Sequence, residues 1–289
     1  MKHGFTVQKQ EKAVDFLCRM LPAVPRATVK AQMRRGEVRV NGHKLKADET
    51  LSAGDRAEIF LPAGLPDAPV KIVYEDDAVI VADKPAHTES ETEFAARLCK
   101  ATGGDVFPVH RLDVNTTGVI VYAKTQEARR AFVEAFRAGE VHKTYAARVF
   151  GCPREDSGIW RAYLKKNADT AFCTVSATPQ EGSLEIVTTF EVVRRGAQSV
   201  LSLHPITGRT HQLRAHAAFM GVPVVGDDKY GNRMQNRAAG AKRQMLRAVE
   251  IAFGALPPPL SYLSGRVFSV ETGQDIECGL KKFDNRVNN

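Results

Sequence analysis

Short amphipathic segments separated by turn residues open the chain. Apolar residues within 14–21 recur at helical spacing, and Pro22 predicts the end of this helix. A second helix is predicted over residues 26–35, with Gly36 at its end and Thr28 as a candidate cap. The first part of the chain therefore begins with two short helices.

Alternation of apolar and polar residues then predicts a small β-hairpin. Residues 38–40 alternate, Asn41-Gly42 is a strong hairpin turn, and residues 44–46 form the returning strand. A turn at Gly54-Asp55 leads into a further strand over residues 57–60. We expect the two helices to pack against this small sheet.

A stretch rich in proline and glycine follows, over residues 62–69. It can continue neither a helix nor a central strand, so we interpret it as a linker. The chain should therefore divide into a small domain over residues 1–65 and a larger one over residues 70–289.

The larger part mixes strand and helix patterns. Strands are expected within residues 72–82, 119–123, 143–149, 171–177, 184–193 and 198–203. Helices are expected over residues 91–101, 125–139 and 211–220, the last with Thr210 as cap and Gly221 at its end. No strand–helix–strand period is present. The pattern predicts an α+β fold with a mixed or antiparallel sheet.

Composition narrows the class of protein. The chain has 289 residues, of which 43% are hydrophobic, which suffices for a core in each part. Its formal net charge is +8, and residues 1–65 carry +5 of it, which favours a polyanionic partner. No apolar run is long enough to cross a bilayer, and the polar start is not a signal peptide. Five scattered cysteines indicate reduced thiols, and we expect a cytoplasmic protein.

The second predicted helix carries a basic stripe. Arg26, Lys30 and Arg34 recur every four residues and so share one face, with Arg35 beside them. Such a stripe suits the phosphates of a nucleic acid. The alternative is a helix face that is merely solvated.

One carboxylate lies shortly before the start of a predicted strand. The run His110-Arg111-Leu112-Asp113 is followed by a turn, 114–118, and by the apolar residues 119–123. A lone acid in this place suits a nucleophile or a general base. A carboxylate that only stabilises the turn is the alternative.

A second dense cluster of polar residues spans 205–216. His211 and His216 lie five residues apart, on different faces of the predicted helix, and no cysteine or acidic pattern accompanies them, which disfavours a metal site. The sequence has no phosphate-binding glycine loop and no Gly-x-Ser-x-Gly turn, which disfavours nucleotide hydrolysis and serine hydrolase chemistry.

The N-terminal residues resemble a known RNA-binding family. Residues 26–30, the run 35–42 with its Gly-x-Val-x-Val-Asn-Gly step, and Gly54-Asp55 are similar to an S4 (α-L-like) RNA-binding domain over residues 10–62. This resemblance implies that Arg26, Lys30, Arg34 and Arg35 contact structured RNA.

The larger part resembles the RluA-type pseudouridine synthases. The resemblance rests on His110-Arg111-Leu112-Asp113 with Thr117-Gly118, on Lys143-Thr144-Tyr145, and on 207–214, in this order. Lys84-Pro85 and Gly226-Asp227 with Tyr230-Gly231 fit the same family, and the match spans residues 70–255. It implies an enzyme that detaches uracil from ribose and rejoins it through carbon 5, with no cofactor and no metal.

The resemblance also implies roles for particular residues. Asp113 would be the nucleophile or base, Arg214 the cation that keeps it ionised, and Tyr145 a ring that stacks on uracil and takes part in proton transfer. What Asp113 attacks first stays open. His110 and His211 are expected to hold their loops by hydrogen bonds rather than to act in catalysis.

Other residues are expected to contact the RNA. Arg111 would fill the gap left by a flipped uridine or contact a phosphate, and Leu213 would line the base pocket or belong to the core. Arg209 would contact phosphate. Arg247 and the basic tract 242–243 would contact phosphate or face solvent.

The chain departs from the family pattern at three positions. His87 stands where glycine is usual, Thr117 where serine is commoner, and Arg247 where histidine is usual. None of these departures falls on Asp113, Tyr145 or Arg214. They therefore bear on which RNA is the substrate rather than on the reaction.

We therefore expect a monomeric pseudouridine synthase that acts on structured RNA, with ribosomal RNA, and its large subunit, favoured over tRNA. One alternative is a catalytically silent RNA-binding or ribosome-assembly factor that retains the fold. Another is a hydrolase that releases uracil.

Overall fold

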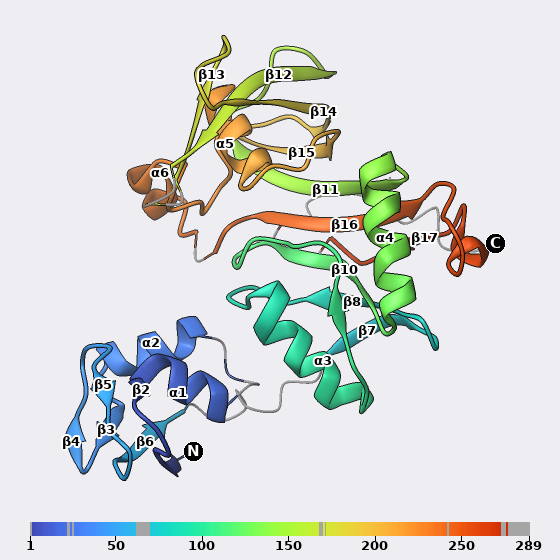
Figure 1. Ribbon diagram of the computed structural model, residues 1–289. Coiled ribbons are helices and arrows are strands. Elements are labelled where there is room, and N and C mark those ends of the chain that lie inside the picture. Colours follow the sequence, from blue (N-terminus) through green and yellow to red (C-terminus); the bar gives the residue numbers. More distant parts are fainter. Residues whose placement is uncertain are drawn as a thin grey trace.

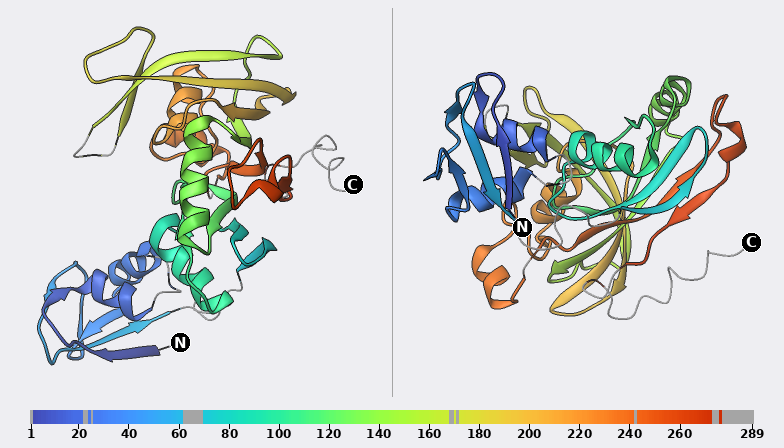
Figure 2. Two further views of the ribbon diagram at one scale, coloured as in Figure 1. Left: turned by 45° about the vertical axis from the view of Figure 1, so that its right-hand side comes forward. Right: turned by 90° about the horizontal axis from the view of Figure 1, so that it is seen from below.

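Two large hydrophobic cores organise the protein, one within residues 7–61 and the other within 79–268, and two smaller clusters accompany the second. The structure is a computed structural model, and it describes residues 2–21, 24, 26–61, 70–167, 170, 172–241, 243–272 and 276. The predicted linker over residues 62–69 and Lys242 lie outside this set. Figures 1 and 2 show the smaller part of the chain in blue and the larger part in colours from cyan to red.

The smaller part packs two helices on a small sheet. The helices are α1 (Ala13–Met20) and α2 (Arg26–Arg34). The sheet has the order β1-β6-β3-β4, formed by Lys2–Thr6, Arg56–Phe60, Val38–Val40 and His43–Lys44. A short antiparallel pair joins β2 (Glu11–Lys12) to β5 (Thr50–Leu51). The helices and the hairpin confirm the sequence prediction, which missed β1, β2 and β5.

The turn chemistry of this part follows the sequence closely. Asn41 and Gly42 both adopt left-handed backbone angles, at φ 50° and 84°, as a tight hairpin turn requires. Thr28 is not a cap, because α2 already begins at Arg26. The carboxylate of Glu93, in the larger part, accepts a hydrogen bond from the Arg26 N–H. The start of α2 is thus satisfied from outside its own domain.

The larger part is built on one mixed sheet, confirming the predicted α+β class. Within the described residues its order is β13-β12-β14-β15-β11-β16-β10-β8-β7, with β17 on β16 and β9 on β10 (Figure 1). The strands are β7 (Lys71–Glu75), β8 (Val79–Lys84), β9 (Phe107–Pro108), β10 (Thr117–Ala123), β11 (Val141–Phe150), β12 (Ser157–Lys166), β13 (Cys173–Ser176), β14 (Leu184–Arg194), β15 (Gln198–Pro205), β16 (Leu246–Phe253) and β17 (Val267–Ser269). The pairing of β10 with β16 is parallel.

Helices cover the sheet and frame its centre. They are the wide π-turn η1 (Ser90–Phe94), α3 (Ala95–Thr102), α4 (Gln126–Ala138), α5 (Gln212–Phe219), α6 (Arg233–Ala238) and the short 3₁₀ turn η2 (Ser261–Leu263). In both figures the smaller part lies beside α3, and α4 crosses the sheet near β10 and β16. The predicted helix 125–139 is confirmed, with Thr125 as its cap and Gly139 at its end in a left-handed conformation.

The two parallel strands meet closely beside the first sequence motif. Gly118 pairs with Ala248 and has φ 113°, and a Cβ atom on it would lie 1.9 Å from the Ala248 carbonyl oxygen. Only glycine allows this approach. The residues that precede β10, including Asp113, are therefore brought to the centre of the sheet.

Candidate active site

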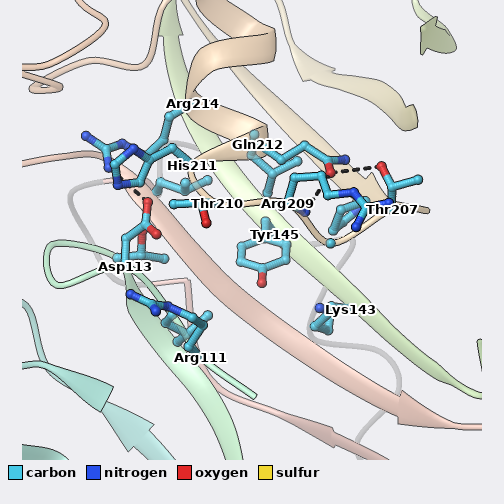
Figure 3. Close-up of a pocket in the computed structure, with 16 residues that line it drawn as sticks. Arg111, Asp113, Lys143, Tyr145, Thr207, Arg209, Thr210, His211, Gln212 and Arg214 are labelled. Carbon is cyan, nitrogen blue, oxygen red and sulfur yellow. Dashed lines mark hydrogen bonds and ion pairs between the residues drawn. The ribbon is translucent and has the colours of Figure 1, made fainter. Parts of the chain in front are cut away.

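A single pocket collects the three residues expected to carry catalysis. Asp113 comes from the loop before β10, Tyr145 from β11 and Arg214 from α5, and all three line one cavity of about 140 Å³ (Figure 3). Arg111, Arg209 and Leu213 line the same cavity. Asp113 and Arg214, which are 101 residues apart in sequence, thus meet in one place.

Arg214 lies between two carboxylates. Its Nη1 donates to Asp113 Oδ2 at 2.9 Å, while its Nε and Nη2 donate to the two oxygens of Asp227 at 2.6 and 3.0 Å. The guanidinium also lies over the ring of Tyr230, 5.2 Å from its centre. Asp227 is 1% exposed. Sequence reasoning noted Gly226-Asp227 only as a family loop and missed this role.

Charge pairing decides the ionisation of these groups. Burial alone would lower the pKa of Arg214, but its bonds to Asp227 and Asp113 raise that pKa above the ordinary value. Burial would likewise raise the pKa of Asp227. Hydrogen bonds from Arg214 and from the backbone of Tyr230 and Lys229 hold it below the usual range. Both groups therefore stay charged.

A buried lysine fastens the loop that carries Asp113. Lys84 is fully buried, and its Nζ donates to the carbonyls of Thr88, Pro85 and Val114 at 2.8, 3.0 and 3.3 Å. Burial lowers the pKa of Lys84 to about 8, although the charge of Asp113 opposes this shift. Val114 directly follows Asp113, so this ammonium fixes the backbone next to the carboxylate.

Tyr145 enters the pocket at an irregularity of β11. The register between β11 and β16 shifts between Thr144 and Tyr145, a bulge of the kind that redirects side chains near active sites. Burial, reinforced by the charge of Asp113, raises the pKa of Tyr145 well above its ordinary value. The phenol therefore keeps its proton, and its ring forms one wall of the cavity (Figure 3).

Comparisons with known proteins agree with this arrangement. The profile of the RNA pseudouridylate synthase family matches residues 73–219, and that of the S4 domain matches residues 13–56. The chain belongs to the RNA pseudouridylate synthase family. As a pseudouridine synthase it is an isomerase.

Similar proteins carry related names. The chain is 32% identical over 266 residues to ribosomal large subunit pseudouridine synthase C of Vibrio vulnificus, covering 83% of each protein. It is 32% identical over 278 residues to the protein of the same name in Haemophilus ducreyi, covering 86% and 87%. Human RNA pseudouridylate synthase domain containing 1 shares the fold, with a TM-score of 0.58, 24% identity, and coverage of 72% of this chain and 93% of the human one.

The residues at the rim of the synthase pocket are placed as follows. Arg111 is exposed and its Nη1 lies 3.1 Å from Glu91 Oε2. Leu213 is 7% exposed, and it both lines this pocket and packs in the main core. Arg209 lines the pocket, and its N–H donates to Gln212 Oε1 at 3.0 Å.

The two histidines of the synthase motifs make the expected loop contacts. His110 Nε2 accepts a hydrogen bond from the N–H of Val121 at 3.0 Å, and burial lowers the pKa of His110 to about 3. His211 Nδ1 lies 2.8 Å from the hydroxyl of Tyr230. The predicted cap at Thr210 is wrong, because α5 begins at Gln212 and His211 occupies the N-cap position, without a capping side-chain hydrogen bond.

The departures from the family pattern have local explanations. His87 has φ 60°, so the turn keeps the left-handed conformation for which glycine is usual. Arg247 is paired with Asp83 at 2.7 Å and also donates to the carbonyl of Glu271. In the structure Arg247 is thus held by an ion pair and a backbone carbonyl, and its contact with RNA stays a prediction.

The basic stripe of α2 is exposed. Arg26, Lys30, Arg34 and Arg35 all face solvent, although Arg26 is ion-paired with Asp15 at 2.5 Å. In the described part of the chain, no group of three or more potential metal ligands comes together. None of the described helices is long and apolar enough to cross a membrane.

Proposed function

We propose that this pseudouridine synthase isomerises specific uridines in structured ribosomal RNA, with the large subunit favoured, and that Asp113 starts the reaction. Two lines support this substrate. The curated relatives are named for the large ribosomal subunit, and an S4 domain with an exposed basic stripe precedes the synthase domain. We further propose that the protein acts as a monomer, with tRNA as an alternative substrate.

The contact between Asp113 and Arg214 carries the proposal for the site. The Asp113 side chain is 19% exposed, and Arg214 is its hydrogen-bonding partner among the described residues, through Oδ2 alone. The other oxygen is left for substrate. A carboxylate that is held by one charge-assisted hydrogen bond, with its second oxygen unengaged, can act as a nucleophile or as a general base.

The reaction breaks the bond between uracil N1 and ribose C1′ and forms one between C5 and C1′. The proton on C5 is lost and N1 gains one, so the product is an isomer of the substrate. Asp113 would start this sequence by attack on the sugar, by attack on the base, or by removal of a sugar proton. Tyr145 would stack on the uracil, and its protonated hydroxyl would serve the transfer at C5.

RNA contacts outside the pocket complete the proposal. Arg111 stands at the rim, next to Asp113, where it would fill the gap left by the flipped uridine. Leu213 would pack on the base and Arg209 would contact a phosphate. Lys30, Arg34 and Arg35, with Arg26, would bind the RNA backbone through α2.

The test is a pseudouridine map of ribosomal RNA. We expect purified protein to produce new reverse-transcription stops after chemical adduct formation, and ribosomal RNA from cells that lack the protein to lose the same stops. Asp113→Asn should abolish product while leaving the fold intact. Unchanged RNA with the wild-type protein would instead support a silent RNA-binding factor, and abasic sites would support a uracil hydrolase.

A further inference from the structure

His211 stands in a backbone conformation that side chains rarely adopt. It precedes α5 at φ 55° and ψ 17°, in the left-handed region. Such strained residues gather at functional sites, where the surrounding structure holds them in place. The imidazole lines the pocket beside Asp113 and Arg214 (Figure 3).

The Nδ1 atom of this imidazole is held by a short chain of hydrogen bonds through Tyr230. His211 Nδ1 lies 2.8 Å from Tyr230 Oη, and the same oxygen accepts the backbone N–H of Cys173 at 3.0 Å. This oxygen still has its own proton to donate, and we take His211 Nδ1 as the acceptor of that proton. The Cys173 thiol donates to the Thr210 carbonyl at 3.3 Å, and its sulfur is a weak competing acceptor.

The hydrogen bond from Tyr230 determines which nitrogen of the His211 ring carries the proton. An imidazole whose Nδ1 accepts a hydrogen bond carries its proton on Nε2 when neutral. Burial lowers the pKa of His211 below its ordinary value and so favours the neutral form.

The charged groups around the ring act on that pKa in both directions. Asp113 and Asp227 raise it, and Arg214 and Lys229 lower it. Within the described residues, Tyr230 is the hydrogen-bonding partner of the His211 ring, through Nδ1. Nε2 thus remains available to a bound molecule.

We propose that His211 is a substrate-binding residue whose Nε2–H donates a hydrogen bond to an oxygen of the target nucleotide, with Tyr230 as the residue that positions it. The proposal rests on the proposed function, since it takes the occupant of the pocket to be a uridine in RNA. It assigns His211 a role in binding rather than in acid–base catalysis.

The tautomer is tested first, without RNA. Nitrogen-15 spectra of the full-length protein at pH 7 should show His211 neutral and protonated on Nε2. His142, exposed on β11, serves as the reference histidine. Tyr230→Phe keeps the ring contacts with Arg214 and removes only the hydroxyl, so the midpoint of the His211 titration should rise. A ring protonated on Nδ1, an imidazolium at pH 7, or a midpoint that falls would overturn the proposal.

Substrate binding is tested next, in single-turnover assays on a stem–loop RNA that carries a uridine mapped for this protein. His211→Asn tolerates the left-handed backbone but is too short to place a donor where Nε2 lies. It should slow the reaction on the order of tenfold, the loss expected for one hydrogen bond to substrate. His142→Gln should leave the rate unchanged.

Failure of this proposal is separable from failure of the proposed function. A His211→Asn protein that melts like the wild type and reacts at the same rate would remove His211 from substrate binding. Retained activity in Asp113→Asn would instead overturn the role of Asp113. If His211→Asn does not fold, the His211 titration in Tyr230→Phe still decides whether Tyr230 donates its proton to His211 Nδ1, on which the proposal depends.

Discussion

Arg214 and Asp227 form a two-point ion pair in which both side chains are almost fully buried, with N–O distances of 2.6 and 3.0 Å. Asp227 binds the edge of the guanidinium formed by Nε and Nη2, and Asp113 binds Nη1. The plane of the guanidinium is therefore set by Asp227 and not by the proposed nucleophile. Asp113 receives a charge partner without having both oxygens engaged.

Replacing Asp227 should damage both stability and activity. Removal of one charge from a buried pair leaves the other uncompensated, so Asp227→Asn should lower the free energy of unfolding at pH 7 by about 3 kcal/mol. Misplacement of Arg214 should slow the reaction by roughly 100-fold. Urea unfolding and single-turnover assays measure the two effects.

The effect on stability should depend on pH. The folded-state pKa of Asp227 lies below the unfolded value, so its contribution is present above about pH 4 and is lost as the pH falls through the folded pKa. The difference between wild type and Asp227→Asn should shrink accordingly in acid. Asp228→Asn, at an exposed neighbour, is the control, and an equal loss there would contradict the assignment.

Lys84 should make activity sensitive to alkali. Three carbonyls need the three N–H donors of the ammonium, and with a pKa of about 8 one donor is lost as the pH rises. We expect the rate to fall above about pH 8 as the Asp113 loop loosens. Lys84→Met should be slow at every pH and should lack this alkaline decline.

The stability of the protein should change in the opposite sense over the same range. The folded-state pKa of Lys84 lies below the unfolded value of 10.5, so the unfolded chain binds more protons between about pH 8 and 10.5. The burial penalty is fully present below pH 8 and is relieved as the pH rises through this window. In this pH range the free energy of unfolding of the wild type should rise relative to that of Lys84→Met. Urea unfolding at several pH values measures this difference. Lys46→Met, at an exposed lysine, is the control.

The α2 stripe should contribute affinity without sequence preference. Lys30 and Arg34 are exposed, whereas Arg26 is engaged with Asp15. The double replacement of Lys30 and Arg34 by Gln should weaken RNA binding and reduce the slope of log affinity against log salt by roughly two, about one for each phosphate contact. Arg26→Gln should change the slope less. An unchanged slope in the double variant would exclude this face from RNA binding.

Features predicted correctly from the sequence are mostly local. The hairpin at Asn41-Gly42 follows from two residues that tolerate a left-handed backbone, and α4 follows from its spacing, its cap and Gly139. Strand β12 was missed because its polar and charged residues hide an alternation that pairing across the sheet makes clear, and β16 was missed although six of its eight residues are apolar.

Features of the site that sequence reasoning missed depend on distant contacts. Lys84 and Asp227 are charged residues in sequence, and nothing local says that they are buried. Their burial follows from carbonyls up to 30 residues away, for Lys84, and from a guanidinium 13 residues away, for Asp227. Family resemblance supplied the candidates at Asp113, Tyr145 and Arg214, while the supporting groups required the fold.

The role proposed for Arg111, filling the gap in an RNA stem, requires that this side chain first leave Glu91. The two side chains are 59% and 46% exposed and lie 3.1 Å apart, and exposed pairs of this kind contribute about 0–1 kcal/mol. Glu91→Gln should therefore raise affinity for a stem that contains the target uridine by up to about fivefold, with a smaller gain at high salt.

Removal of any acidic residue near RNA would also raise affinity, so the decisive measurement is a double-mutant cycle. In the Arg111→Gln background, Glu91→Gln should lose most of its effect, because the pair that it releases no longer exists. An equal gain in both backgrounds would show that Glu91 repels RNA without restraining Arg111. A smaller gain in the Arg111→Gln background would instead mean that the ion pair with Glu91 holds Arg111 at the pocket rim until RNA binds.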